Sequence, residues 1–172
     1  MKVYVRTTGE RELDKSYNKL DYELLIDKEH KPVESFIAQL NIISNDDALL
    51  IEDDLILPNN FIAKVKKIIK KYPNMIINFY DKHNKITKIE KAIFSNQATF
   101  YPKGVSNKIA SEMSKHLPYP NYDYLETMAL QSLDIEIVNY KPNLVLHKDG
   151  YSLITKTYRK NCTKEDKEKW QL

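Results

Sequence analysis

The chain has 172 residues, of which 27 are basic and 24 acidic, so its formal net charge is +3. A chain of this length can bury a substantial core, and the balanced charge excludes nucleic-acid binding driven by a strong overall basic charge. Three glycines exclude a glycine-rich phosphate loop, and a single cysteine excludes a disulfide framework within the chain.

In the first half of the chain, short apolar runs alternate with segments whose apolar residues recur at helical spacing. The runs predict strands, and the spaced segments predict helices. The predicted strands are 3–5, 22–26, 48–51 and 75–79, and the predicted helices are 32–43 and 58–69. This alternation predicts an α/β fold, with a mostly parallel, Rossmann-like sheet flanked by helices.

The pattern changes after residue 80, where a polar, Lys-rich segment predicts a hairpin or a mobile loop at 81–91. Further strands are predicted at 98–101, 135–138 and 144–146, and helices at 104–116 and 123–133. A charged helix or tail is predicted at 163–170. No stretch approaches the roughly 20 apolar residues of a membrane helix, and the single cysteine fits a reducing compartment, so we expect a cytoplasmic protein.

Three carboxylates, Glu52, Asp53 and Asp54, directly follow the apolar run 48–51. Ligands bind at the carboxyl ends of the strands in open α/β sheets, and clustered carboxylates repel one another unless a cation or hydrogen-bond donors compensate them. Mg²⁺ or Mn²⁺ is the simplest compensator. Strand alternation puts Glu52 and Asp54 on one side and Asp53 on the other. We predict a metal site here; the alternative is a solvated acidic turn that precedes a helix.

Four polar residues follow the first two predicted strands. Arg6 and Arg11, with Thr7 between them, come after the first strand and could hold a diphosphate through bidentate hydrogen bonds. Ordinary surface charge is the alternative interpretation of both arginines. Asp27, at the end of the second strand, could accept hydrogen bonds from a ribose or a base.

Two further residues are candidates for chemistry. His147 follows the predicted strand 144–146 and could be a metal ligand, although a lone histidine is more often a surface or core residue. Asp123 begins a predicted helix after two prolines, so helix capping is its default role. Beside a metal, the same carboxylate would suit a general base.

Four motifs occur in order over residues 2–155. They are the apolar strand that runs into Glu-Asp-Asp and a Phe-led helix (49–61), the Tyr-Pro-Lys-Gly turn (101–104), the acidic helix start (122–125), and Pro-Asn-Leu-Val-Leu-His (142–147) with Gly and Ser soon after. In this order and spacing they resemble the small lipopolysaccharide-type, Glu-Asp-Asp-containing glycosyltransferases of the GT-A fold.

The resemblance implies a single-domain GT-A fold over 1–155, followed by a charged helix or tail at 156–172. It also implies transfer of a sugar from a nucleotide diphosphate sugar to an acceptor hydroxyl, with Mn²⁺ or Mg²⁺ as the cofactor. The acceptor could be a glycan, a protein or a modified nucleic acid. The chain is short for such enzymes, and this puts the acceptor in question more than the donor.

The same resemblance implies roles for the candidate residues. Asp54 and His147 would bind the metal, while Glu52 and Asp53 would position the ribose or the water shell of the metal. Asp123 would take the proton from the acceptor, which would give inversion at the anomeric carbon.

Two other classes of function compete with this interpretation. A metal-dependent nuclease or phosphohydrolase would also use clustered carboxylates, but the other predicted strand ends supply no second acidic pair. A non-catalytic module that binds a nucleotide or a glycan would keep the fold without the reaction. Metal-independent binding without donor hydrolysis would distinguish that module from an enzyme.

Overall fold

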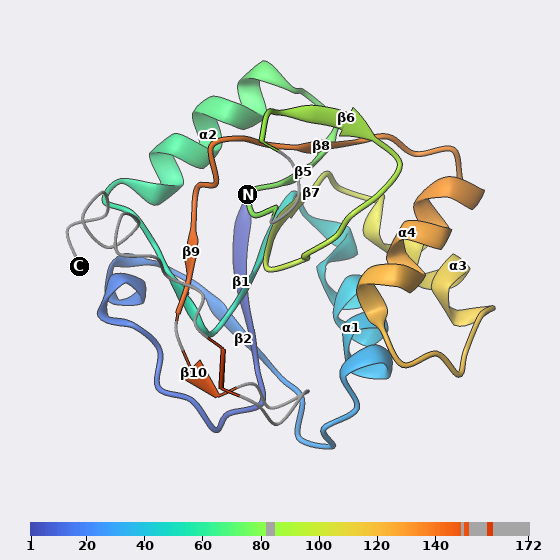
Figure 1. Ribbon diagram of the computed structural model, residues 1–172, viewed down its shortest axis with the longest axis horizontal. Helices are drawn as coiled ribbons and strands as arrows, with labels where there is room; N and C mark the ends of the chain where they lie inside the picture. The colour runs from blue at the N-terminus through green and yellow to red at the C-terminus, as the bar shows by residue number, and fades with distance from the viewer. Residues whose placement is uncertain (82–84, 149, 152–157, 160–172) are drawn as a thin grey trace.

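Seven strands form one mixed sheet, and helices cover both of its faces in the computed structural model of this chain (Figure 1). The structure describes residues 1–81, 85–148, 150–151 and 158–159. The α/β class predicted from the alternation of apolar patterns is therefore confirmed for this part of the chain.

The sheet is mostly parallel, as predicted. In spatial order its strands are β2 (Glu23–Ile26), β1 (Lys2–Thr7), β3 (Ala48–Glu52), β7 (Ala98–Tyr101), β5 (Ile76–Asn78), β8 (Ile137–Asn139) and β6 (Lys88–Glu90). Strands β2, β1, β3, β5 and β8 run in one direction, whereas β7 and β6 run in the opposite one. Strand β6 lies inside the segment 81–91, for which the sequence predicted a hairpin or a loop.

Helices α1 (Pro32–Ile42), α3 (Ser106–Ser114) and α4 (Tyr122–Ser132) pack together on one face, and α2 (Phe61–Lys71) covers the other (Figure 1). Pro32 occupies the first turn of α1, where its missing N–H costs nothing. Two short 3-10 helices, Lys15–Lys19 and Ile43–Asn45, complete the helical elements of the described chain. None of its helices has both the length and the apolar character needed to cross a bilayer.

Strand β3 lies inside the sheet and is apolar until its last residue. Ala48 and Leu50 pack toward α1, α3 and α4, while Leu49 and Ile51 pack toward α2. Successive side chains of a strand point to opposite faces, so a strand buried on both faces must be apolar throughout. The first polar side chain, Glu52, therefore marks the point where the strand leaves the core.

Two small antiparallel pairs lie beside the main sheet. Strand β4 (Leu55–Ile56) pairs with β9 (Leu146–His147), with Leu55 opposite His147. This pairing places a histidine from late in the chain next to the residues that follow β3. The second pair is β10 (Gly150–Tyr151) with β11 (Tyr158–Arg159). The helix or tail predicted at 163–170 lies outside the described residues, as does most of the predicted tail 156–172.

The central position of β3 predicts the effect of truncating one of its side chains. Leu49→Ala should destabilise the protein by about 2–5 kcal/mol, because Leu49 is fully buried and its truncation leaves a cavity. Urea unfolding followed by circular dichroism measures this change. Ile89→Ala on the edge strand β6, where the side chain is 51% exposed, is the matched control and should cost less than about 1 kcal/mol. Equal losses in the two variants would contradict this account of the core.

Candidate metal centre

Arg6, Thr7 and the carboxylates of residues 52–54 lie at the carboxyl ends of β1 and β3, which are neighbouring parallel strands. Strand β2 pairs with one side of β1 and β3 pairs with the other side, so the direction in which successive strands join the sheet reverses at β1. Such a switch point is where open α/β sheets bind ligands, because the connections on either side lead away from each other. Strand β7 runs antiparallel to β3, and this brings the segment that precedes β7, residues 95–97, beside Glu52.

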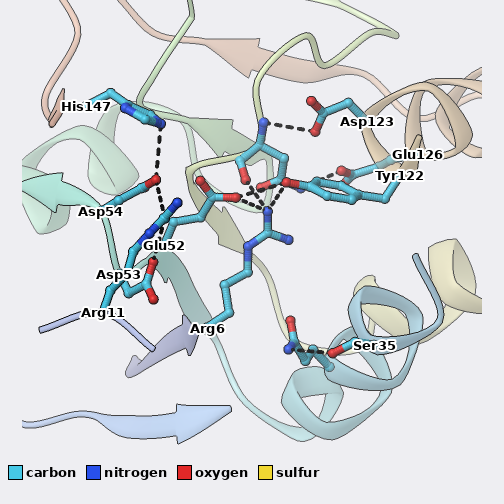
Figure 2. A network of polar contacts seen from close by, with 12 residues as sticks. Arg6, Arg11, Ser35, Glu52, Asp53, Asp54, Tyr122, Asp123, Glu126 and His147 are labelled. Atoms are coloured by element: carbon cyan, nitrogen blue, oxygen red, sulfur yellow. Dashed lines mark hydrogen bonds and ion pairs between the residues drawn. The ribbon is translucent and has the colours of Figure 1, made fainter. Parts of the chain in front are cut away.

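Arg6 compensates the charge of Glu52. Its Nη2 donates to Glu52 Oε1, to the hydroxyl of Tyr122 and to the carbonyl of Asn96, the last at 3.2 Å (Figure 2). The guanidinium lies 4.9 Å from the ring centre of Phe36 and 4.4 Å from that of Tyr122. Burial disfavours the charged form of Glu52, but Arg6 outweighs it, and the pKa of this carboxyl lies below its usual value.

Asp53 lies in the turn that follows β3, where the alternation of the strand no longer applies, and it shares Arg11 Nη1 with Asp54. Its Oδ2 accepts a hydrogen bond of 2.5 Å from Thr7 Oγ1, and its Oδ1 lies 3.3 Å from Arg11 Nη1. Thr7 Oγ1 also accepts the N–H of Gly9, which fixes the turn after β1. Asp53 is 5% exposed, so these donors replace the water that a carboxylate would otherwise bind.

Asp54 and His147 face each other across the β4–β9 pair. Asp54 Oδ2 lies 3.4 Å from His147 Nε2 and 2.6 Å from Arg11 Nη1 (Figure 2). The other ring nitrogen, Nδ1, lies 2.9 Å from the carbonyl oxygen of Lys148. A carbonyl can only accept, so Nδ1 is the donor in this contact, and Nε2 is the ring nitrogen that faces Asp54.

Glu52, Asp54 and His147 fit the requirements of a divalent metal. Each offers one ligand atom, and these atoms lie within 4.8 Å of one another. Asp54 Oδ1 is buried and has no hydrogen-bond partner among the described residues, which is costly for a carboxylate oxygen. Two carboxylates and one imidazole form a donor set that suits Mn²⁺ and also Mg²⁺. The structure brings the strand-end Glu-X-Asp pair and His147 together, and metal binding by this group stays a prediction.

Burial raises the pKa of Asp54 to about 6, and repulsion by Glu52 adds to the shift. His147 and Arg11 act in the opposite direction without cancelling it. The carboxyl that is best placed to bind a cation is therefore also the one whose charge is least compensated by the protein.

Asp123 lies in the first turn of α4 but does not cap this helix. The cap is Asn121, whose Oδ1 accepts the N–H of Tyr124 at 3.2 Å. Asp123 Oδ1 instead accepts the backbone N–H of Asn96 at 3.2 Å (Figure 2). The default capping role is therefore wrong, and the carboxylate is directed toward the segment that also contacts Arg6.

A buried network lies behind Asn96. Its Nδ2 contacts Glu126 Oε2 at 2.5 Å and the Tyr101 hydroxyl at 2.7 Å, and Tyr101 donates to Glu126 Oε1 at 2.7 Å. Glu126 is fully buried, and burial raises its pKa to about 7, although these two hydrogen bonds act in the opposite direction. Asn96 thus joins this network to Arg6 and Asp123 through its own backbone.

Two sequence candidates lie apart from the carboxylate group. Asp27 hydrogen-bonds the backbone N–H of Lys31 at 3.2 Å, before α1. The turn after Tyr101 lies at the opposite end of β7 from the carboxylates, because Tyr101 pairs with Ala48 at the start of β3. Gly104 in that turn has a φ of +77°, a conformation that glycine adopts without strain.

The sequence reasoning missed Asn96, Tyr122 and Glu126. Tyr122 directly precedes Asp123 in the predicted helix start, so the sequence alone places it beside a candidate residue. The other two carry no local signal. Asn96 reaches the site only because β7 is antiparallel to β3, and Glu126 only because α4 packs over that end of the sheet.

No protein-family model matches the sequence, and no curated protein shows significant similarity to it.

The raised pKa of Glu126 predicts a stability that depends on pH. The folded state holds this proton up to a pH of about 7, whereas the unfolded chain releases it near 4.5. Between these values the folded state binds more protons, so the stability that Glu126 contributes below pH 4.5 is lost as pH rises toward 7. The loss is on the order of 3 kcal/mol, at 1.36 kcal/mol for each pKa unit.

Glu126→Gln stays neutral at every pH and should remove this part of the pH dependence. Urea unfolding of both proteins at pH 5 and pH 8 measures it, and the variant should gain stability relative to the parent at the higher pH. The contribution of Asp54 is common to both proteins and cancels in the comparison. A difference between parent and variant that is the same at both pH values would contradict the assignment.

Proposed function

We propose that this protein is a metal-dependent glycosyltransferase of the GT-A fold that moves a sugar from a nucleotide diphosphate sugar to an acceptor hydroxyl. The observation that supports this most strongly is the convergence of Glu52, Asp54 and His147 at the switch point of a mostly parallel sheet. These residues come from two of the four motifs that carry the resemblance. A third motif supplies Asp123, which joins the same polar network through Asn96.

The carboxylate side of the site would bind the donor. Thr7 ends β1 and Arg11 follows it. Both contact Asp53, and Arg11 also contacts the candidate metal ligand Asp54. When bound to Asp54 and His147, with Glu52 nearby, a divalent ion supplies the positive charge that a diphosphate leaving group requires. The sequence predicted that Arg6 holds phosphate, but its guanidinium pairs with Glu52 between two aromatic rings. Arg6 would therefore have a different role.

Asp123 would act as the general base on the acceptor side. Its carboxylate would take the proton of the acceptor hydroxyl, while the hydroxyl oxygen bonds to the anomeric carbon and the bond from that carbon to the diphosphate breaks. The hydrogen bond from the Asn96 N–H holds one carboxylate oxygen in place. Asn96 is in turn held by Glu126 and Tyr101, which therefore position the base without touching the substrate.

A thermal-shift panel tests the donor and the metal together. Nucleoside diphosphates and their sugars, each with Mn²⁺ or with a chelator, should give one nucleotide whose binding raises the melting temperature only with metal. At a ligand concentration of about 100 times its Kd, the rise should be about 5–10 °C.

Asp54→Asn should abolish this shift, because it removes a charged ligand of the metal. Asp134→Asn is the matched control, since Asp134 is exposed and pairs with Lys91 on the surface, and the shift should persist there. A shift that persists with chelator would favour a metal-independent binding module. Cleavage of a phosphodiester in the absence of nucleotide sugar would favour a nuclease.

Asp123→Asn tests the base. The amide keeps an oxygen that can accept the Asn96 N–H but cannot take a proton, so kcat should fall by about 10²–10⁴-fold. The Kd of the donor, measured by calorimetry, should not change. If turnover stays within tenfold of the parent, Asp123 is not the base.

A further inference from the structure

Arg11 shares a carboxylate oxygen with the candidate metal centre. Its Nη1 lies 2.6 Å from Asp54 Oδ2, and His147 Nε2 lies 3.4 Å from the same oxygen (Figure 2). The guanidinium also reaches Asp53 Oδ1 at 3.3 Å. A divalent ion on either oxygen of the Asp54 carboxylate would lie close enough to this guanidinium for the two cations to repel each other strongly. The two cations therefore compete for Asp54.

The two arginines of the site differ in how firmly they are held. The Arg6 side chain is 10% exposed, is flanked by the rings of Phe36 and Tyr122, and pairs with Glu52. The Arg11 side chain is 28% exposed and belongs to the connection between β1 and the first 3-10 helix. Arg11 can therefore exchange its partners with less disturbance of the core than Arg6 can.

The charges of the site favour such an exchange. Glu52, Asp53 and Asp54 carry three negative charges against two positive charges on Arg6 and Arg11, so the group has a net charge of −1 and repels a polyanion. Addition of a divalent ion changes the net charge to +1. The guanidinium that the ion displaces from Asp54 is then a donor for phosphate oxygens at the same strand end.

We propose that Arg11 is an exchangeable cation that couples metal binding to diphosphate binding. It holds Asp53 and Asp54 until a divalent metal takes its place, and it then moves to the diphosphate. The site accordingly binds a metal–diphosphate complex in preference to either ion alone. The diphosphate part rests on the proposed function, whereas the competition between Arg11 and the metal does not.

The test measures the affinity for Mn²⁺ alone, from the electron paramagnetic resonance signal of the free ion at about pH 8, well above the ordinary carboxylate pKa range. Arg11→Gln removes the competing charge and should bind Mn²⁺ at least about fivefold more tightly than the parent, at the lower end of typical coupling energies. Arg11→Lys keeps a charge and should remain near the parent value. Calorimetry with preformed Mn²⁺–pyrophosphate measures the second step.

Coupling predicts opposite changes in these two measurements for Arg11→Gln. Its affinity for Mn²⁺ should rise, while its preference for Mn²⁺–pyrophosphate over Mn²⁺ should fall at least about fivefold. Lys2→Gln is the charge-matched control, because Lys2 pairs with Asp46 at the opposite end of β1, and both affinities should stay at the parent values. Unchanged or weaker Mn²⁺ binding by Arg11→Gln, in a variant that melts as the parent does, would overturn the proposal.

The two proposals can fail separately. If Arg11→Gln binds Mn²⁺ more tightly and no nucleotide sugar is turned over, the competition stands and the transferase proposal falls. If sugar transfer is observed but the variant binds Mn²⁺ no more tightly than the parent, the transferase proposal stands and the exchange falls.

Discussion

Repulsion among three consecutive carboxylates is the constraint that organises this end of the molecule. Each carboxylate is compensated in a different way: Glu52 by a buried arginine, Asp53 by a threonine hydroxyl and Arg11, and Asp54 by Arg11 and the proximity of a histidine. The compensation is weakest at Asp54, whose pKa is raised and whose Oδ1 has no hydrogen-bond partner in the part of the chain that the structure describes. The three carboxylates of the site therefore differ in how strongly the protein itself compensates their negative charge.

The Glu52–Arg6 pair also links the site to the helical layer. Arg6 contacts Phe36 of α1 and Tyr122 of α4, so the sheet end and two helices meet around one guanidinium. From there the hydrogen bonds continue through Asn96 to Glu126 and Tyr101, which lie within the core. The position of Asp123 therefore depends on the packing of α4 against the sheet, as well as on its own helical turn.

The sequence predicted the parts of this architecture that rest on local patterns. Apolar runs located the central strands, and the change from Ile51 to Glu52 located the end of β3. The partners of these residues depend on pairings between distant segments. The antiparallel direction of β7, which brings Asn96 to Arg6, has no signature in four residues of strand, and strand β6 is a short, largely exposed edge in a Lys-rich segment. The contact of Arg6 with Glu52 could not be predicted either, because a strand-end arginine is equally suited to solvent, phosphate or carboxylate.

The pairing of β4 with β9 has a consequence for the order in which the site is assembled. Leu55 and His147 are neighbours in space although most of the chain separates them, and only two residues of strand on each side hold them together. Contacts between such distant segments form late in folding, because closing a long loop costs entropy before the contact can compensate it. During synthesis, the carboxylates of β3 emerge well before their histidine. A chain that has reached only α4 can build most of the sheet but still lacks His147, so the candidate metal centre is completed only in a nearly finished fold.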